Sequence, residues 1–240
     1  MCNRAVIIGA TGGIGSALAR ELHARSPVTE VFALARNPDK IDLPFAVPVH
    51  CDVADEGSVR AAAGAVARHG LVDLVIVASG ILAPPGSAGP EKNLRGLDPA
   101  VMAQMMVVNA IGPALLAKHF LPLFPRDARA VFAALSARVG SISENRLGGW
   151  HSYRASKAAL NMLVRGAAIE LGRTHRQAIA VTLHPGTVDT ALSAPFQRGV
   201  APDRLFSPGQ SAGYLLDVIT GLSADQTGTC VAWDGAPIAF

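Results

Sequence analysis

"VIIGATGGIGSALARELHAR", residues 6–25, passes from an aliphatic run through a glycine-rich turn into a pattern with helical spacing. Such a turn needs glycines where the backbone bends sharply, approaches a ligand closely or packs against the helix. The glycines fit two spacings, GxxxGxG with Gly9, Gly13 and Gly15, or GxxGxxG with Gly9, Gly12 and Gly15. Either spacing predicts a strand, a tight turn and a helix whose first N–H groups can bind an anion.

The rest of the chain continues this alternation of strand and helix. Short aliphatic runs predict strands buried on both faces, and helical patterns lie between most of them. The runs lie at 4–9, 30–35, 45–53, 71–79, 128–136, 178–185 and 228–233, and the helical patterns at 13–25, 55–69, 98–121, 153–172 and 208–220. Such alternation implies right-handed crossovers. We therefore expect an α/β fold with a single Rossmann-like, doubly wound parallel sheet of about seven strands, and residues 1–240 as one domain.

Composition narrows the classes of function. The chain has 50% hydrophobic and 16% charged residues, and its net charge is +3. This charge excess is too small to predict nucleic-acid binding, and no apolar run reaches spanning length without a charge, glycine or proline. The three cysteines, Cys2, Cys51 and Cys230, are far apart and show no metal-binding spacing. We expect no metal site and no membrane segment, and reduced thiols in a cytoplasmic protein.

The carboxyl ends of the strands are where a sheet of this kind binds its ligand. A glycine-rich turn between the first strand and the first helix predicts a dinucleotide there. Arg36 follows the second strand, where an NAD site would carry a carboxylate, and the first acidic residue is Asp39. A guanidinium can bind a 2′-phosphate through two hydrogen bonds. We therefore expect NADP(H) rather than NAD(H); a solvated surface arginine is the alternative.

"YRASKAALNML", residues 153–163, places Tyr153 and Lys157 on one face of a predicted helix. Tyrosine has a pKa of about 10, and acid–base work near neutral pH asks for about 7, a gap of about 4 kcal/mol. One cation about 4 Å away contributes about 4 kcal/mol at an effective dielectric of about 20. Lys157 is therefore expected to lower the pKa of Tyr153 enough for acid–base catalysis. The alternative is a surface tyrosine beside a solvated lysine.

These motifs, in this order, resemble the short-chain dehydrogenase/reductase family over essentially the whole chain. "GATGGIG" resembles its cofactor loop, "CDV" (51–53) its adenine contacts, and "LHPGTVDTAL" (183–192) its segment near the nicotinamide. "VVNAIGPALLAKHFLP" (107–122) resembles its central helix and "VFAALSARVGSIS" (131–143) its fifth strand. "SARVGSIS", "GGWHSYRASKAALN" and "WDGAPI" are similar to the C-factor and sniffer-type carbonyl reductase branch.

The resemblance implies hydride transfer between NADP(H) and a carbonyl or alcohol substrate. Tyr153 would be the general acid/base and Ser136 would hold the substrate oxygen. Lys157 would also bind the nicotinamide ribose, and Asn109 would support a water that links Lys157 to solvent. With the residues argued above, the expected cofactor contacts are Gly9, Thr11, Gly13, Ile14, Gly15, Arg36, Asp52, Val53, Ala78, Ser79, Gly80, Tyr153, Lys157, Pro185, Gly186, Val188 and Thr190.

Several assignments keep an alternative. Ser141 and Ser143 compete with Ser136, which we prefer because it ends the predicted strand. Ser136 itself can instead be a strand-end cap, and Asn109 a helix kink or an amide that satisfies backbone groups. "VASG" (77–80) replaces the family's NNAG and removes two asparagines. This departure keeps a second hypothesis open, a nucleotide-sensing or signalling protein of C-factor type with little turnover.

Two variable segments should form the substrate site. Residues 190–209 contain Pro, Gly and two phenylalanines, which predicts a mobile apolar lid, and residues 82–98 predict a second wall. Neither contains an arginine cluster for an acidic substrate, so we expect a small apolar carbonyl or alcohol compound. The helices at 98–121 and 153–172 resemble those through which family members form homodimers or homotetramers. Their apolar outer faces can equally be ordinary core.

Overall fold

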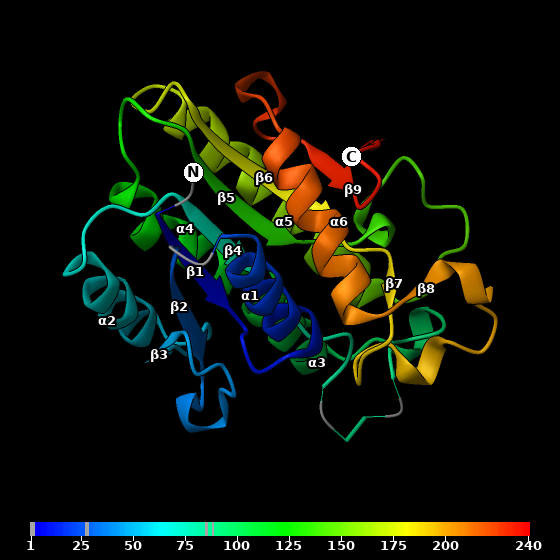
Figure 1. Cartoon of the computed structure of the whole chain (residues 1–240). Helices are drawn as coiled ribbons and strands as arrows, with labels where there is room; N and C mark the ends of the chain where they lie inside the picture. The colour runs from blue at the N-terminus through cyan, green and yellow to red at the C-terminus, as the bar shows by residue number, and fades with distance from the viewer. Residues whose placement is uncertain (1–2, 27–28, 85, 88) are drawn as a thin grey trace.

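The fold is described from a computed structural model that covers residues 3–26, 29–84, 86–87 and 89–240. Among these residues, the central element is an eight-stranded sheet in the order β10-β9-β6-β5-β4-β1-β2-β3 (Figure 1). Its strands are β1 (Arg4–Ile8), β2 (Glu30–Ala35), β3 (Val47–His50), β4 (Leu74–Val77), β5 (Ala130–Leu135), β6 (Ala178–His184), β9 (Cys230–Ala232) and β10 (Pro237–Ile238). All neighbouring strands are parallel except β10, which pairs antiparallel with β9. The expected Rossmann-like sheet is confirmed, with one further edge strand.

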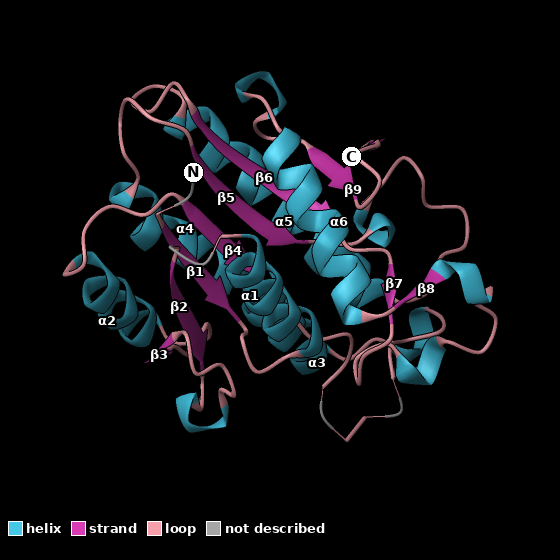
Figure 2. Ribbon diagram, in the orientation of Figure 1, coloured by secondary structure: helices cyan, strands magenta, loops and turns pink. Residues whose placement is uncertain are grey.

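Helices cover both faces of the sheet (Figure 2). They are α1 (Gly13–Arg25), α2 (Glu56–Ala67), α3 (Pro99–Met106), α4 (Gly112–Phe120), α5 (His151–Leu171) and α6 (Pro208–Gly221). One face packs its buried side chains against α1 and α6, and the other against α2, α4 and α5. Because successive strand residues point to opposite faces, strands buried on both sides are apolar at nearly every position.

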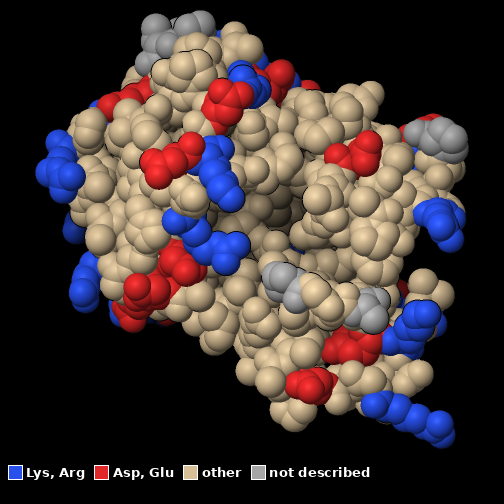
Figure 3. Space-filling model, turned by 90° about the horizontal axis from the view of Figure 1, so that it is seen from below, with Lys and Arg blue, Asp and Glu red and all other residues tan. Residues whose placement is uncertain are grey.

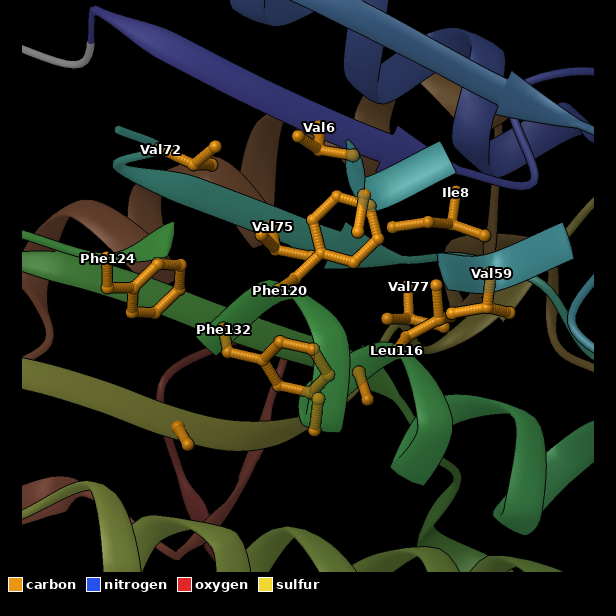
Figure 4. Close-up of a cluster of buried hydrophobic side chains, with 14 of the residues drawn as sticks. Val6, Ile8, Val59, Val72, Val75, Val77, Leu116, Phe120, Phe124 and Phe132 are labelled. Atoms are coloured by element: carbon orange, nitrogen blue, oxygen red, sulfur yellow. The ribbon is translucent and has the colours of Figure 1, made fainter. Parts of the chain in front are cut away.

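Large side chains fill the second of these cores (Figure 4). Phe120 of α4 and Phe132 of β5 are fully buried there, beside Val6, Val75 and Leu116. Each such side chain contributes about 1.5–3 kcal/mol by leaving water. The core thereby fixes α4 and α5 against the strands whose carboxyl ends carry the site.

The helix expected at 98–121 is interrupted. A π-helical turn (Val107–Ile111) separates α3 from α4. Pro113 stands four residues after Asn109 and has no N–H to donate to the Asn109 carbonyl, which accounts for the wider turn there. The π turn places Asn109, fully buried, at the bend.

Residues Pro99–Leu123 form the single helical segment, within the described residues, that is long and apolar enough to cross a membrane, with a mean hydropathy of 1.7. Its two α-helices pack on α5, and α4 also packs on α2. A core helix of a folded α/β layer passes the same test of length and composition, so this segment is weak evidence for a membrane span.

Cys51 and Cys230 are buried and unpaired. Burial raises the pKa of the Cys51 thiol to about 12, so that thiol stays protonated and unreactive near neutral pH. Both side chains serve as apolar core, as expected, and Cys2 lies outside the described residues.

The strand order reverses direction between β1 and β4, because the chain runs from β1 outward to β3 and then returns to β4. The loops that follow β1 and β4 therefore diverge at the carboxyl edge of the sheet and leave room for a ligand. A further pair of short parallel strands, β7 (Thr187–Val188) and β8 (Leu205–Phe206), lies beyond this edge.

Candidate active site

A cleft of about 510 Å³ lies at the carboxyl ends of β1, β2, β3 and β4. Figure 3 looks toward this edge of the molecule and shows a hollow in the surface. The expected cofactor residues in its walls are Gly9, Thr11, Arg36, Asp52, Val53, Ala78, Ser79 and Gly80. The elements that were predicted to bind one dinucleotide are therefore brought together in one place.

The glycine-rich turn is crowded at three of its glycines. Gly9 has φ +84, and a Cβ there would lie 2.8 Å from the Ser79 nitrogen. A Cβ on Gly13 would lie 2.9 Å from the Thr190 side chain, and one on Gly15 would lie 2.8 Å from the Gly9 carbonyl carbon. Gly12 has more room, with its nearest contact at 3.2 Å. The packing thus favours the GxxxGxG spacing over GxxGxxG.

Gly15→Ala should lower the free energy of unfolding by about 1–3 kcal/mol, because the new methyl group meets fixed backbone. Gly64→Ala is the matched control. Gly64 lies inside α2, where a Cβ meets nothing within 4 Å, and we expect a gain of about 0.5–1 kcal/mol. Urea unfolding midpoints measure both changes. Equal stabilities of the two variants would show that the turn is not crowded at Gly15.

The N-terminus of α1 offers the anion site that the sequence predicted. Its N-cap is Gly12, which makes no side-chain cap, and the first turn contains no acidic residue. The first N–H groups of the helix therefore face the cleft without competition from a side-chain carboxylate or hydroxyl of α1.

Arg36 directly follows β2 and is exposed in the cleft wall. Its carbonyl accepts a hydrogen bond from His50 Nδ1 at 2.9 Å when that nitrogen is protonated. Within the described residues, its guanidinium makes no ion pair and is available to an anionic ligand. Asp52 is half-buried, and its Oδ1 accepts from the Ala54 nitrogen at 3.0 Å.

The "VASG" segment keeps a polar group for the cleft. Ser79 Oγ is buried and has no hydrogen-bond partner among the described residues. A buried hydroxyl without a partner is costly unless a ligand or water satisfies it. Together with the crowded glycines and the uncapped α1, this orphaned hydroxyl fits a bound dinucleotide.

A second pocket, of about 310 Å³, lies at the ends of β5 and β6. Ser136 and Tyr153 both line it, as do Ile14, Pro185, Gly186, Val188 and Thr190 from the expected cofactor set. Apolar side chains of residues 82, 139, 150, 192, 196 and 200 make up most of the remaining wall. The expected apolar substrate site therefore contains two of the expected catalytic residues, Ser136 and Tyr153.

Ser136 is better placed than its two competitors. It directly follows β5 and is buried, and its Oγ donates to Asn161 Oδ1 at 2.8 Å. Ser141 Oγ instead accepts from the Glu144 nitrogen within a turn, and neither Ser141 nor Ser143 lines the pocket. No motif in the sequence pointed to Asn161 as a functional residue, although it stands four residues after Lys157 on the same helical face.

Tyr153 and Lys157 share the buried face of α5. The Lys157 Nζ donates to the Leu135 carbonyl at 2.8 Å and lies 5.7 Å from the centre of the Tyr153 ring. Burial raises the pKa of Tyr153 to about 12 and lowers the pKa of Lys157 to about 8. The shift of the tyrosine is opposite to the one expected from the sequence, because burial disfavours the charged phenolate.

Asn109 links two parts of the site. Its Oδ1 accepts from the Ile81 nitrogen at 2.9 Å, and its Nδ2 donates to the Ile81 carbonyl at 2.8 Å and to Ser156 Oγ at 3.1 Å. The alternative of an amide that satisfies backbone groups therefore describes what Asn109 does in the folded chain. It ties the segment after β4 to α5 close to Lys157, whose Nζ would lie 3.6 Å from a Cβ on Gly80.

The lid expected at 190–209 leaves the sheet through β7 and returns through β8. Phe206 anchors the returning end against the rings of Tyr214 and Trp233, at 5.3 and 4.6 Å between ring centres. At the far end of the lid, Phe196 meets Trp150 at 5.1 Å. Phe196 and Trp150 both line the pocket that contains Tyr153. No pattern in the sequence pointed to Trp150 as part of this pocket.

His184 is a further polar residue of this pocket that the sequence did not identify as functional. Its Nδ1 is buried with no hydrogen-bond partner in the described part of the chain. Burial, with help from the nearby Arg138 guanidinium, lowers the pKa of His184 to about 4, so the imidazole is neutral at physiological pH. It therefore faces the pocket as an uncharged hydrogen-bonding group.

Known proteins are similar to this chain in sequence or in fold. C-signal of Myxococcus xanthus is 34% identical over 147 residues, which cover 61% of this chain and 83% of C-signal. An NADPH-bound carbonyl reductase from chicken fatty liver superposes with a TM-score of 0.86 at 29% identity, over 99% of both chains. The carbonyl reductase Sniffer of D. melanogaster has the same fold, with a TM-score of 0.84 at 23% identity over the full length of both chains.

These likenesses confirm the resemblance to the C-factor and sniffer-type branch. The sequence model described as short chain dehydrogenase matches residues 3–200. Because that match spans most of the 240 residues, the chain belongs to the short chain dehydrogenase family.

Proposed function

We propose that the protein is an NADP(H)-dependent carbonyl reductase that interconverts small apolar carbonyl compounds and their alcohols. The observation that carries this proposal is that Ser136 and Tyr153 line one apolar pocket, with Lys157 behind them. The pocket shares the carboxyl edge of the sheet with a cleft suited to a dinucleotide. Binding of NADPH by the chicken carbonyl reductase, whose whole chain superposes on this one, supports the same cofactor here.

The residues divide the chemistry of reduction between them. Bound NADPH would supply the hydride to the carbonyl carbon. Tyr153 then donates its phenolic proton to the carbonyl oxygen, and a pKa raised to about 12 keeps that proton in place until it is needed. Without substrate, the Ser136 hydroxyl donates its hydrogen bond to Asn161 Oδ1. With substrate bound, the same hydroxyl would rotate and donate to the carbonyl oxygen instead. Lys157 would bind the nicotinamide ribose. Asn109 would support the water that links Lys157 to solvent, and through this link Tyr153 would regain a proton.

The proposed cofactor contacts are assigned from the residues that line the cleft and the second pocket. The glycine turn of Gly9, Gly13 and Gly15 and the start of α1 would hold the pyrophosphate, and Arg36 the 2′-phosphate. Asp52 and Val53 would border the adenine. The orphaned Ser79 hydroxyl would gain a partner. In the second pocket, residues 185–190 would close over the nicotinamide.

Arg36→Asp should abolish or reverse the preference for NADPH over NADH. A partly shielded guanidinium–phosphate contact contributes about 1.5–3 kcal/mol, which corresponds to roughly ten- to a hundredfold in affinity. The new carboxylate repels the phosphate and offers an acceptor to the ribose hydroxyls of NADH. Fluorescence titration gives Kd for both cofactors, and kcat at saturation should change little because Arg36 is remote from the transferred hydride.

Lys40→Asp is the control for this prediction. It makes the same change of charge on the exposed stretch after β2, but Lys40 does not line the cleft. Its effect on the NADPH/NADH ratio should stay within about twofold. If wild-type protein binds NADH as tightly as NADPH, Arg36 is a surface arginine and the cofactor assignment is wrong.

The direct test is a screen for NADPH oxidation with aldehydes, ketones and quinones. Turnover of apolar members of these classes supports the reductase. Tight NADPH binding without turnover on any of them would favour the second hypothesis, a nucleotide-sensing or signalling protein with little turnover. The 34% identity to C-signal is the observation that keeps this alternative.

The arrangement of the chain also suggests its assembly. We infer that residues 1–240 act as one domain, since one sheet runs through the described chain, and that a second copy packs on the outer face of α4 and α5. That face carries a groove of about 970 Å³, and Met162 and Ile169 are more than half exposed on it. A homodimer or homotetramer in the cytoplasm would cover these side chains.

A further inference from the structure

The helix that carries Tyr153 begins in an unusual way. Three successive residues before it, Gly148, Gly149 and Trp150, have φ of +63, +64 and +52. Trp150 is the single non-glycine residue in this left-handed region among the described residues. It also occupies the N-cap position of α5, and its side chain makes no capping hydrogen bond. The start of α5 therefore lacks the local support that a Ser, Thr, Asp or Asn cap would give.

Glu91 supplies that support from another part of the chain. Its Oε2 accepts from the Ser152 nitrogen at 3.3 Å, and its Oε1 accepts from Ser152 Oγ. Its own carbonyl accepts from the Trp150 nitrogen at 2.5 Å. All three bonds end on the two residues at the start of α5 that flank His151, and Ser152 directly precedes Tyr153.

The electrostatics of this contact are favourable. A carboxylate at a helix N-terminus interacts well with the helix dipole and with the N–H groups that have no partner in the helix. Ser152 is 1% exposed, so its hydroxyl and amide depend on a protein partner. A cavity of about 200 Å³ adjoins the pair, and Glu91 supplies the one carboxylate of its described walls. If the Glu91 carboxylate were removed, no other described residue in the walls of this cavity could supply a negative charge to the start of α5.

We propose that Glu91 is a positioning residue for Tyr153, which caps α5 from the segment between β4 and α3 and thereby fixes the phenol in the pocket. The proposal rests on the proposed function, in which Tyr153 is the proton donor. Trp150, whose amide donates to the Glu91 carbonyl, also contacts Tyr153 edge to face, with 6.3 Å between the ring centres. Since Leu82 of the same segment lines the substrate pocket, this cap also links the substrate wall to the catalytic helix.

Glu91→Ala should lower kcat for carbonyl reduction by about ten- to a hundredfold, because a displacement of about 1 Å at a reacting group can cost that much. Kd for NADPH should stay within about twofold, since Glu91 does not line the cofactor cleft. Glu91→Gln keeps one acceptor oxygen for Ser152 and should recover part of the lost kcat. A residue with a merely structural role would lower thermal stability in both variants without this graded loss of kcat in the folded protein.

Ser152→Ala removes the partner hydroxyl and sharpens the test. Because both residues act through one contact, the double variant Glu91→Ala/Ser152→Ala should lose little more activity than Glu91→Ala alone. Glu56→Gln is the control, since its carboxylate binds Lys118 and His119 on the side of the sheet where α2 meets α4. Its kcat should equal that of wild type. Additive losses in the double variant would contradict a shared contact.

Amide hydrogen exchange of the first turn of α5 separates this proposal from the proposed function. Glu91→Ala should speed exchange of peptides covering residues 150–157 at least tenfold, whereas Glu56→Gln should not. If wild-type protein turns over no carbonyl compound, the reductase assignment fails, and exchange alone then decides whether Glu91 caps α5. Unchanged exchange, or a kcat of Glu91→Ala within twofold of wild type, would overturn the proposal.

Discussion

Tyr153→Phe should lower kcat for NADPH-dependent carbonyl reduction by about 10²–10⁴-fold, the range lost with a general acid. The phenol is the expected proton donor, and burial holds its pKa at about 12, so that it is protonated throughout the neutral range. The substitution removes only the hydroxyl and keeps the aromatic ring. The packing of the ring against Leu82 and Met105 remains. The free energy of unfolding should therefore change little.

The second tyrosine of the chain provides the control. Tyr214 lies in α6 and packs against Phe206 and Trp233, away from the pocket walls. Tyr214→Phe makes the same chemical change and should leave kcat unchanged. Steady-state rates with one substrate from the carbonyl screen compare the two variants. Activity that survives in Tyr153→Phe would remove Tyr153 from the mechanism and leave Ser136 or His184 to be tested as the proton donor.

Local sequence signals predicted most of the sheet and its cofactor edge. The glycine turn predicted the β1–α1 unit, because its crowded glycines are neighbours in sequence as well as in space. The β-branched runs predicted the seven parallel strands. The strands β7, β8 and β10 were not predicted, because each has only two residues and two residues show no periodic pattern.

Features that depend on contacts between distant segments were not predictable from local patterns. Glu91 meets Ser152 across 61 positions, and Asn109 meets Ser156 across 47. The predicted direction of the Tyr153 pKa shift was wrong for the same reason. The spacing of Tyr153 and Lys157 gives their shared face, but burial and the bond from Lys157 to the Leu135 carbonyl depend on the strand beneath the helix.

Lys157→Met should reduce kcat by at least about 10²-fold and weaken NADPH binding, since it removes both the ammonium beside Tyr153 and the expected ribose contact. Methionine keeps much of the length and apolar stem of lysine, so the core around α5 should remain packed. Lys118→Met is the control, because Lys118 is exposed on α4 and pairs with Glu56 outside the site. Its kinetics should match those of wild type.

The pH dependence gives Lys157 a signature that Lys157→Met must lack. Burial lowers the pKa of Lys157 from 10.5 to about 8, so the ammonium is present below about pH 8 and is lost as the pH rises through that value. Wild-type kcat/KM for reduction should therefore fall above about pH 8. Between about pH 8 and 10 the unfolded chain keeps a proton on Lys157 that the folded chain has lost, so the contribution of Lys157 to the free energy of unfolding should rise with pH. Lys157→Met should show neither change; a wild-type profile in this variant would remove Lys157 from the mechanism.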